Sequence, residues 1–198
     1  VLEAVSRFGL PIMRDTLPDD PWHPLFRAPA VLDGLIAQGA LGQKTRAGFF
    51  RKIGKDIEVL DPAARAYRKS EGVVDPAVAE ILALKNPGEK FAKLRAHPHP
   101  QAQFLWAIFR DLFHYAAFHL AEIADNARDV DLALRWGFGW AMGPFELWQA
   151  AGWKDVARWL QEDIAAGKAL ASVPLPKWVS EGPAAAGVHT AAGAWSAS

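Results

Sequence analysis

The 198-residue sequence contains no cysteine, which excludes disulfide bonds and thiolate metal sites. It also has no net charge, because 22 basic side chains balance 22 acidic ones. We therefore expect neither nucleic acid nor an anionic membrane surface as a partner. Since no secretory signal peptide is visible either, we expect a cytoplasmic location.

Long uncharged apolar runs are missing too. The most apolar stretch, residues 104–124, contains charged residues such as Arg110 and Glu122, which a membrane span tolerates poorly. We expect a buried core helix here and no membrane span. The six histidines predict no metal site, because His114 and His119, five residues apart on this helix, point about 140° away from each other.

Strand patterns are scarce, whereas signals for the start and end of helices are frequent, so the sequence predicts an all-α fold. Pro29 is expected to open a helix in the first turn. Asp61 and Asp75 are each followed by proline, a pattern typical of a helix N-cap. Short helices are therefore predicted over about residues 63–69 and 77–84.

The second half of the chain predicts longer helices. They are expected over about residues 89–95, 101–125, 129–137, 143–148 and 155–166. Asp129 and Asp131 are interpreted as helix caps. Glu146 follows Gly143 and Pro144, so its carboxylate is expected to accept backbone N–H bonds in the first turn of a helix. A catalytic acid is the alternative role for Glu146.

Two stretches of the chain resemble each other. Pro29 is followed by a Gly-and-Thr motif at residues 42–50, and Pro174 is followed by a similar motif at 187–195, with the same spacing of proline, glycines and threonine. This pattern predicts a tandem repeat whose second copy has degenerated. Chance similarity is the alternative, because glycine, alanine and threonine are common.

The repeat suggests a division of the chain. Residues 1–60 are predicted to be the rear half of a first helical repeat, residues 61–100 a connection of short helices, and residues 101–198 the second, degenerate repeat. The front half of the first repeat is expected to precede Val1. The tail from Ser172 is rich in proline, alanine, glycine and serine, and is expected to pack loosely.

Two motifs resemble a known family. Residues 41–50, LGQKTRAGFF, resemble the L-G-x-K-T-G-x-G-F-Y signature in the C-terminal domain of 3-hydroxyacyl-CoA dehydrogenases. Residues 129–148, DVDLALRWGFGWAMGPFELW, resemble that family's D-I-D-x-A-M-x-x-G-x-G-x-x-x-G-P-F-E-L-x-D stretch. The structural motif positions are Gly42, Lys44, Thr45, Gly48, Phe49, Gly143, Pro144, Phe145 and Glu146. Three positions depart from the pattern: Arg46 replaces a glycine, Phe50 a tyrosine, and Gln149 a common aspartate.

The resemblance implies the C-terminal helical region of a long bacterial dehydrogenase of fatty acid beta-oxidation, in which NAD oxidises a 3-hydroxyacyl-CoA to a 3-oxoacyl-CoA. In some such proteins an enoyl-CoA hydratase domain follows. The family's catalytic residues lie in the dinucleotide-binding domain and ahead of the position of Val1. The resemblance therefore implies that this chain holds no catalytic or cofactor-binding residue. In agreement, it contains no G-x-G-x-x-G motif, which a dinucleotide site requires.

A small basic cluster is the candidate substrate-binding site. Lys44 and Arg46, with Arg51 and Lys52 nearby, follow the turn at Gly42, and such a cluster can contact a phosphate of CoA. A solvated turn is the alternative. The implied partners are the acyl-CoA substrate of the parent protein and the absent dinucleotide-binding domain.

Four tryptophans, Trp136, Trp140, Trp148 and Trp153, are candidates for packing the second repeat against the first. In single-repeat members of the family the helical domains pair between two chains, and a tandem repeat can make the same contact within one chain. Two other functions stay open: a stand-alone helical interaction module without catalysis, and a free-standing acyl-CoA binder.

Overall fold

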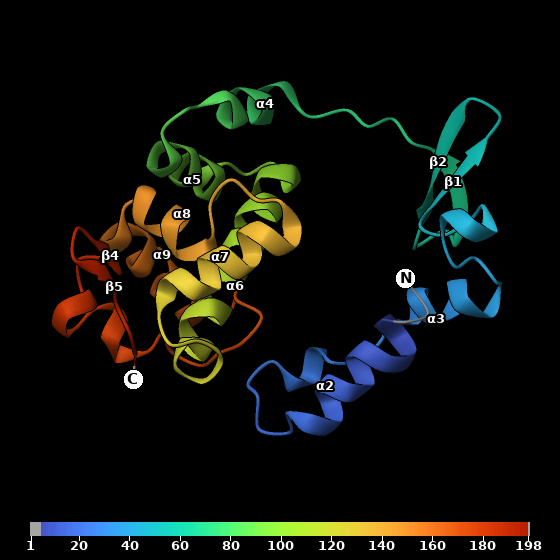
Figure 1. Ribbon diagram of the computed structural model, residues 1–198. Coiled ribbons are helices and arrows are strands. Elements are labelled where there is room, and N and C mark those ends of the chain that lie inside the picture. Colours follow the sequence, from blue (N-terminus) through green and yellow to red (C-terminus); the bar gives the residue numbers. More distant parts are fainter. Residues whose placement is uncertain (1–4, 198) are drawn as a thin grey trace. The chain divides into compact units, whose positions relative to one another are not determined.

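The computed structural model describes residues 5–197 and divides the chain into two compact units, Val1–Val73 and Val74–Ser198 (Figure 1). The division lies inside the segment 61–100. The predicted all-α class needs correction, because the described residues are mostly helical but also form a three-stranded antiparallel sheet and a short hairpin. Among the described residues, no helix has the length and apolar character needed to cross a membrane.

Within its described residues, the first unit contains two α-helices. Helix α2 spans Leu10–Thr16, and α3 spans Ala30–Ala37. The helix predicted to open at Pro29 is confirmed, since Pro29 is the N-cap residue of α3. Leu32 and Leu35 on one side of α3 are buried, which gives this unit part of its small core.

The sheet of the first unit is an antiparallel meander of three strands. Strands β1 (Phe50–Ile53), β2 (Asp56–Asp61) and β3 (Ala66–Lys69) are hydrogen-bonded in the order β1-β2-β3. The guanidinium of Arg51 lies 4.1 Å from the centre of the Tyr67 ring, a cation–π contact that joins β1 to β3.

The helix predicted over residues 63–69 is wrong. Asp61 does accept backbone N–H bonds from Ala63 at 3.0 Å and from Ala64 at 2.9 Å, as an N-cap would. The chain then turns at Arg65, which has a φ of 52°, and returns as β3. An aspartate followed by proline makes the same local bonds at the start of a helix and in a turn, so the sequence signal was ambiguous.

The second unit contains six α-helices among the described residues. They are α4 (Pro76–Ala83), α5 (Pro87–Ala96), α6 (Pro100–Ile123), α7 (Ala127–Phe138), α8 (Pro144–Ala150) and α9 (Trp153–Ala165). The long α6 contacts α5, α7 and α8. The predicted capping of α4 by Asp75 is confirmed. Asp129 does not cap α7, because Asn126 does so by accepting the N–H of Asp129 at 3.2 Å.

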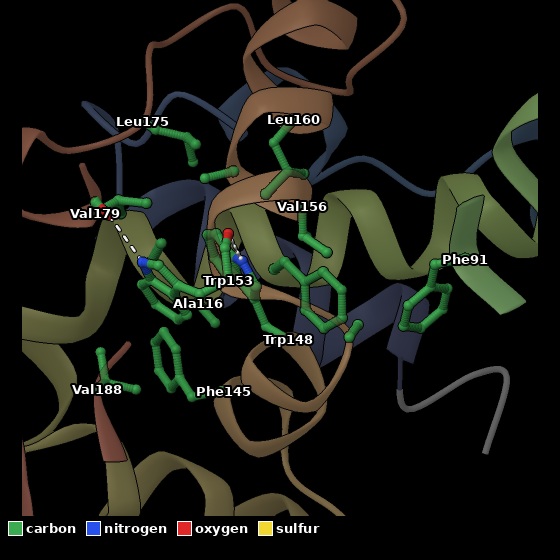
Figure 2. Close-up of a cluster of buried hydrophobic side chains, with 14 of the residues drawn as sticks. Phe91, Ala116, Phe145, Trp148, Trp153, Val156, Leu160, Leu175, Val179 and Val188 are labelled. Atoms are coloured by element: carbon green, nitrogen blue, oxygen red, sulfur yellow. Dashed lines mark hydrogen bonds between the residues drawn. The ribbon is translucent and has the colours of Figure 1, made fainter. Parts of the chain in front are cut away.

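Two of the four candidate tryptophans lie in the core of the second unit (Figure 2). Trp148 and Trp153 are buried, with ring centroids 4.4 Å apart in a stacked arrangement. Each indole N–H has a partner: that of Trp148 donates to the Trp153 carbonyl at 3.0 Å, and that of Trp153 to the Val179 carbonyl at 2.9 Å. Trp136 and Trp140, by contrast, are 79% and 40% exposed.

The C-terminal segment is packed, so the prediction of a loose tail from Ser172 is wrong. Val179, Ala184 and Val188 are almost completely buried and belong to the same apolar core as α6 and α8. The segment also forms a short hairpin of β4 (His189–Thr190) and β5 (Gly193–Ala194). Its composition suggested mobility, but several of its apolar side chains, Leu175 and Trp178 among them, lie in the core or pack against it.

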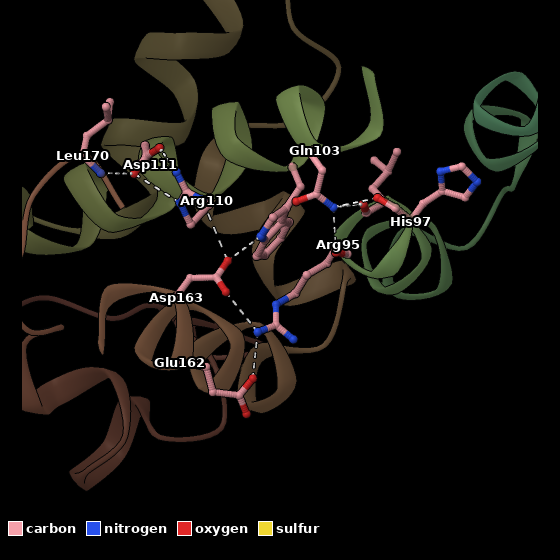
Figure 3. A network of polar contacts seen from close by, with 10 residues as sticks. Arg95, His97, Gln103, Arg110, Asp111, Glu162, Asp163 and Leu170 are labelled. Atoms are coloured by element: carbon pink, nitrogen blue, oxygen red, sulfur yellow. Dashed lines mark hydrogen bonds and ion pairs between the residues drawn. The ribbon is translucent and has the colours of Figure 1, made fainter. Parts of the chain in front are cut away.

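A buried carboxylate joins three helices of the second unit (Figure 3). Asp163 on α9 accepts the indole N–H of Trp106 at 2.7 Å and an N–H of Arg95 at 3.0 Å, and an N–H nitrogen of Arg110 lies 3.9 Å from it. Asp163 is only 2% exposed. A buried charge of this kind depends on its partners, because unpaired it would be strongly destabilising.

Replacing Asp163 by alanine should lower the free energy of unfolding by about 3–5 kcal/mol, because the buried partners lose their acceptor. The matched control is Asp155→Ala on the same helix, whose exposed pair with Arg158 contributes little. Urea denaturation followed by tryptophan fluorescence measures both. Similar losses in the two variants would contradict this role for Asp163.

Candidate functional site

The Gly-Pro-Phe-Glu motif forms the N-terminus of α8. The N–H of Gly143 donates to a carboxylate oxygen of Glu146 at 2.8 Å, which is the capping contact that the sequence led us to expect. The other carboxylate oxygen accepts an N–H of Arg135 on α7 at 2.9 Å. Both oxygens of Glu146 therefore serve internal contacts, and neither has the environment of a catalytic acid.

Asp131 is the second carboxylate at this N-terminus, and it caps α8 and not its own helix α7. Its Oδ1 accepts the N–H of Phe145 at 2.8 Å, and its Oδ2 accepts the N–H of Glu146 at 3.2 Å. Oδ2 also lies 2.7 Å from Nε2 of His189 in β4. Burial raises the pKa of the Asp131 carboxyl, while the hydrogen bonds from Phe145 and His189 act in the opposite direction.

Gly143 is required by the close approach of α7 to the start of α8. A Cβ atom at Gly143 would overlap the Cα and Cβ atoms of Asp131. These are atoms of a fixed backbone and of a side chain held by hydrogen bonds, so they cannot move aside cheaply. The glycine of this motif thus lets the Asp131 carboxylate reach the N–H groups of α8.

The C-terminal segment is held on α8 by Gln149. The Gln149 Oε1 accepts the N–H of Val188 at 2.8 Å and the N–H of His189 at 2.9 Å, and its Nε2 donates to the His189 carbonyl at 2.8 Å. Sequence reasoning did not identify Asp131, Gln149 and His189 as one set. The available signal was the recurrence of the motif at 187–195, which singles out His189.

The first copy of the motif forms a tight turn in the other unit. Gly42 has a φ of 125°, and the Thr45 hydroxyl accepts the N–H of Leu41 at 2.9 Å. Arg46 has a φ of 61°. This is the left-handed region that glycine favours, so the chain keeps there the backbone angle that the family's glycine would permit.

The two predicted substrate-binding residues lie in one groove. Lys44 and Arg46 line a groove of about 1210 Å³, together with Lys52 and Phe50 among others. Arg51 is paired with Glu58 at 2.6 Å. Lys44, Arg46 and Lys52 form no ion pair with the described part of the chain, so the groove presents three uncompensated positive charges.

The residues present do not fit a dinucleotide or metal site. Both sheets among residues 5–197 are antiparallel, whereas an NAD site needs a parallel strand that leads through a glycine-rich turn into a helix. No group of three or more histidine, aspartate or glutamate side chains in this described part is arranged to hold a metal ion.

Substitution of Gly143 by alanine should destabilise the second unit by several kcal/mol, about 2–4, because the new methyl group forces α7 and α8 apart. Gly137→Ala in α7 is the matched control, since nothing lies within 4 Å of a Cβ there and alanine favours a helix. Thermal unfolding compares the two. If Gly143→Ala were as stable as the control, the close approach would not be a constraint.

The comparisons with known proteins point to one family. No family model matches the sequence, and no solved structure matches it significantly. A probable 3-hydroxyacyl-CoA dehydrogenase of Bacillus subtilis (strain 168) is 32% identical over 157 residues, which are 79% of this chain and 19% of that protein.

Two further relatives carry a related name. Putative fatty acid oxidation complex trifunctional enzymes of Rickettsia felis and Rickettsia prowazekii are 25% and 24% identical, each over 81% of this chain and 21% of their own length. The chain thus spans about a fifth of the curated relatives that it matches. It is homologous to part of the 3-hydroxyacyl-CoA dehydrogenases and of the trifunctional fatty acid oxidation enzymes.

Proposed function

We propose that this chain is a C-terminal, scaffold-forming part of an NAD-dependent 3-hydroxyacyl-CoA dehydrogenase of fatty acid beta-oxidation. The parent protein, expected in the cytoplasm, would oxidise the C3 alcohol of a 3-hydroxyacyl-CoA and pass the hydride to NAD. The observation that carries this proposal is the 32% identity to a probable dehydrogenase over 79% of this chain. The catalytic and NAD-binding residues would belong to other parts of the parent protein.

The contacts within the second unit support a scaffold role. The two carboxylates at the start of α8, Asp131 and Glu146, are both occupied by N–H groups, a guanidinium and a histidine. Groups satisfied in this way rigidify a fold and are not available for proton transfer. We infer that residues 101–198 of this unit form the second of two helical repeats, which buttresses the first repeat and shapes the parent enzyme's acyl-CoA cleft.

A chimera tests this proposal. This chain should replace the matching segment of the Bacillus subtilis relative and retain oxidation of 3-hydroxybutyryl-CoA within about tenfold, because the scaffold still positions the catalytic domain. NADH formation is read by absorbance. Deletion of the segment should abolish activity, and the chimera with Gly143→Ala should lose much of it. Full activity of the deletion variant, or a folded but inactive chimera, would overturn the proposal.

A second candidate function is contact with the phosphates of CoA. The observation that favours it is the groove with three cations, Lys44, Arg46 and Lys52, that have no carboxylate partner in the described part of the chain. A stand-alone interaction module is the third candidate. The exposed rings of Trp136 and Phe138 at the end of α7, 79% and 71% exposed, are compatible with a protein contact.

Calorimetry with acetoacetyl-CoA tests the phosphate contact. If the groove binds CoA, the double substitution Lys44→Ala with Arg46→Ala should weaken binding at low salt by about tenfold, since two charges are lost. Lys55→Ala is the matched control, because this neighbouring lysine does not line the groove. No heat from the unsubstituted chain at millimolar ligand would exclude CoA contact by this chain alone.

A further inference from the structure

The two motif copies share an unusual backbone at the same position. Gly42 in the first unit has a φ of 125°, and Gly187 in the second has a φ of 133°. Side chains disfavour this region, which glycine adopts readily. The residues that follow differ in conformation, because Gln43–Thr45 form a 3-10 turn and His189–Thr190 a strand. The correspondence of the two copies, 145 positions apart, therefore covers the spacing of residues and the backbone angle of this glycine. It pairs Gln43 with Val188 and Lys44 with His189.

In the second unit the side chain of Gln149 occupies the space beside Gly187. A Cβ atom at Gly187 would lie 2.5 Å from Oε1 of Gln149. This oxygen accepts the next two backbone N–H groups, those of Val188 and His189, and the His189 ring reaches the buried Asp131. With the bond from Gln149 Nε2 to the His189 carbonyl, the copy at 187–195 is docked on the helix pair α7–α8 through four hydrogen bonds.

In the first unit the corresponding residues line an open groove. Nothing described lies within 4 Å of a Cβ atom at Gly42. The N–H groups of Gln43 and Lys44 have no hydrogen-bond partner within the described residues, and the Lys44 ammonium has no ion pair there. Gln43 and Lys44 both line the groove of about 1210 Å³.

The apolar side chains of the two copies also differ, since they are packed in the second copy and exposed in the first. Trp195 in the second copy packs on Trp178, with ring centroids 4.4 Å apart. Its counterpart Phe50 is 59% exposed, and Ile57, which lines the groove with it, is exposed too. Apolar side chains gathered on an open groove are typical of a contact surface.

We infer that the face formed by Gly42, Gln43, Lys44 and Phe50 is a docking site for a second helix pair of the α7–α8 type. The Lys44 ammonium would pair with a buried carboxylate placed as Asp131 is. The N–H groups of Gln43 and Lys44 would donate to an acceptor side chain placed as Gln149 is.

The occupant is a segment outside this chain. The chain's own α7–α8 pair already holds residues 187–195, so its Asp131 and Gln149 are engaged. The relatives are about five times as long as the part matched here, so a longer protein of this kind has room for such a pair. Lys44 suits the position that His189 has in the second copy, because an ammonium can donate hydrogen bonds to a buried carboxylate as a histidine ring does.

The experiment adds the inferred partner. A copy of residues 126–154 is joined ahead of Val1 through a flexible Gly-Ser linker, and amide hydrogen exchange is measured by NMR in this extended chain and in the 198-residue chain. The amides of Gln43 and Lys44 should exchange at least about tenfold more slowly in the extended chain, because they become hydrogen-bonded. Lys44→Ala should remove that protection of Gln43, whereas Lys55→Ala should preserve it.

Three results would overturn the inference. One is unchanged exchange at both amides in the extended chain, whether or not the added segment folds, because the face is proposed to hold it. Another is equal effects of Lys44→Ala and Lys55→Ala. The third is protection of these amides by acetoacetyl-CoA but not by the added segment, which would make the groove a nucleotide site. The readout is backbone exchange, so it does not depend on whether the parent protein is a dehydrogenase.

The second unit offers an independent check in the chain as it stands. If Lys44 and His189 have equivalent roles, His189→Lys should leave the exchange rate of the Val188 amide within about threefold, and His189→Ala should raise it about tenfold or more. Equal acceleration in both variants would contradict the equivalence of the two copies.

Discussion

The carboxylate of Asp131 is buried where α7, the start of α8 and the C-terminal segment meet. A carboxylate in such a place is tolerated only when donors surround it, and here they are two N–H groups of α8 and the ring of His189. Gly143 has no side chain because Asp131 occupies its space. The course of the C-terminal segment follows as well, since His189 must reach this carboxylate.

The helices could be predicted because their signals are local. Pro29 and Asp75 act on the first turn of the helices that they precede, and the long apolar pattern of α6 needs no distant partner. The strand β3 could not be predicted, because Asp61 accepts the same backbone N–H bonds in this turn as it would at the start of a helix. The packing of the C-terminal segment depends on contacts such as that between Trp153 and Val179, 26 residues apart, which composition does not encode.

In the candidate site too, contacts between neighbouring residues could be predicted and contacts between distant residues could not. The capping role of Glu146 was predictable because its partner Gly143 is three residues away. The pairing of Asp131 with His189 joins residues 58 positions apart, and a single histidine gives no hint of its partner. The internal repeat did contain information, because it placed His189 and Lys44 in equivalent positions. Only the structure shows what one of them contacts.

The residue types in the two motifs have a physical explanation that requires no catalysis. Glycine at 42 and 187 serves a backbone angle, Thr45 closes a turn through its hydroxyl, and the ring of His189 pairs with the buried carboxylate of Asp131. A pattern by which an enzyme family is recognised can thus reflect how a domain folds. Lys44 would then be retained for the same reason as His189, and its charge would serve the assembly of the repeat and not the chemistry of the substrate.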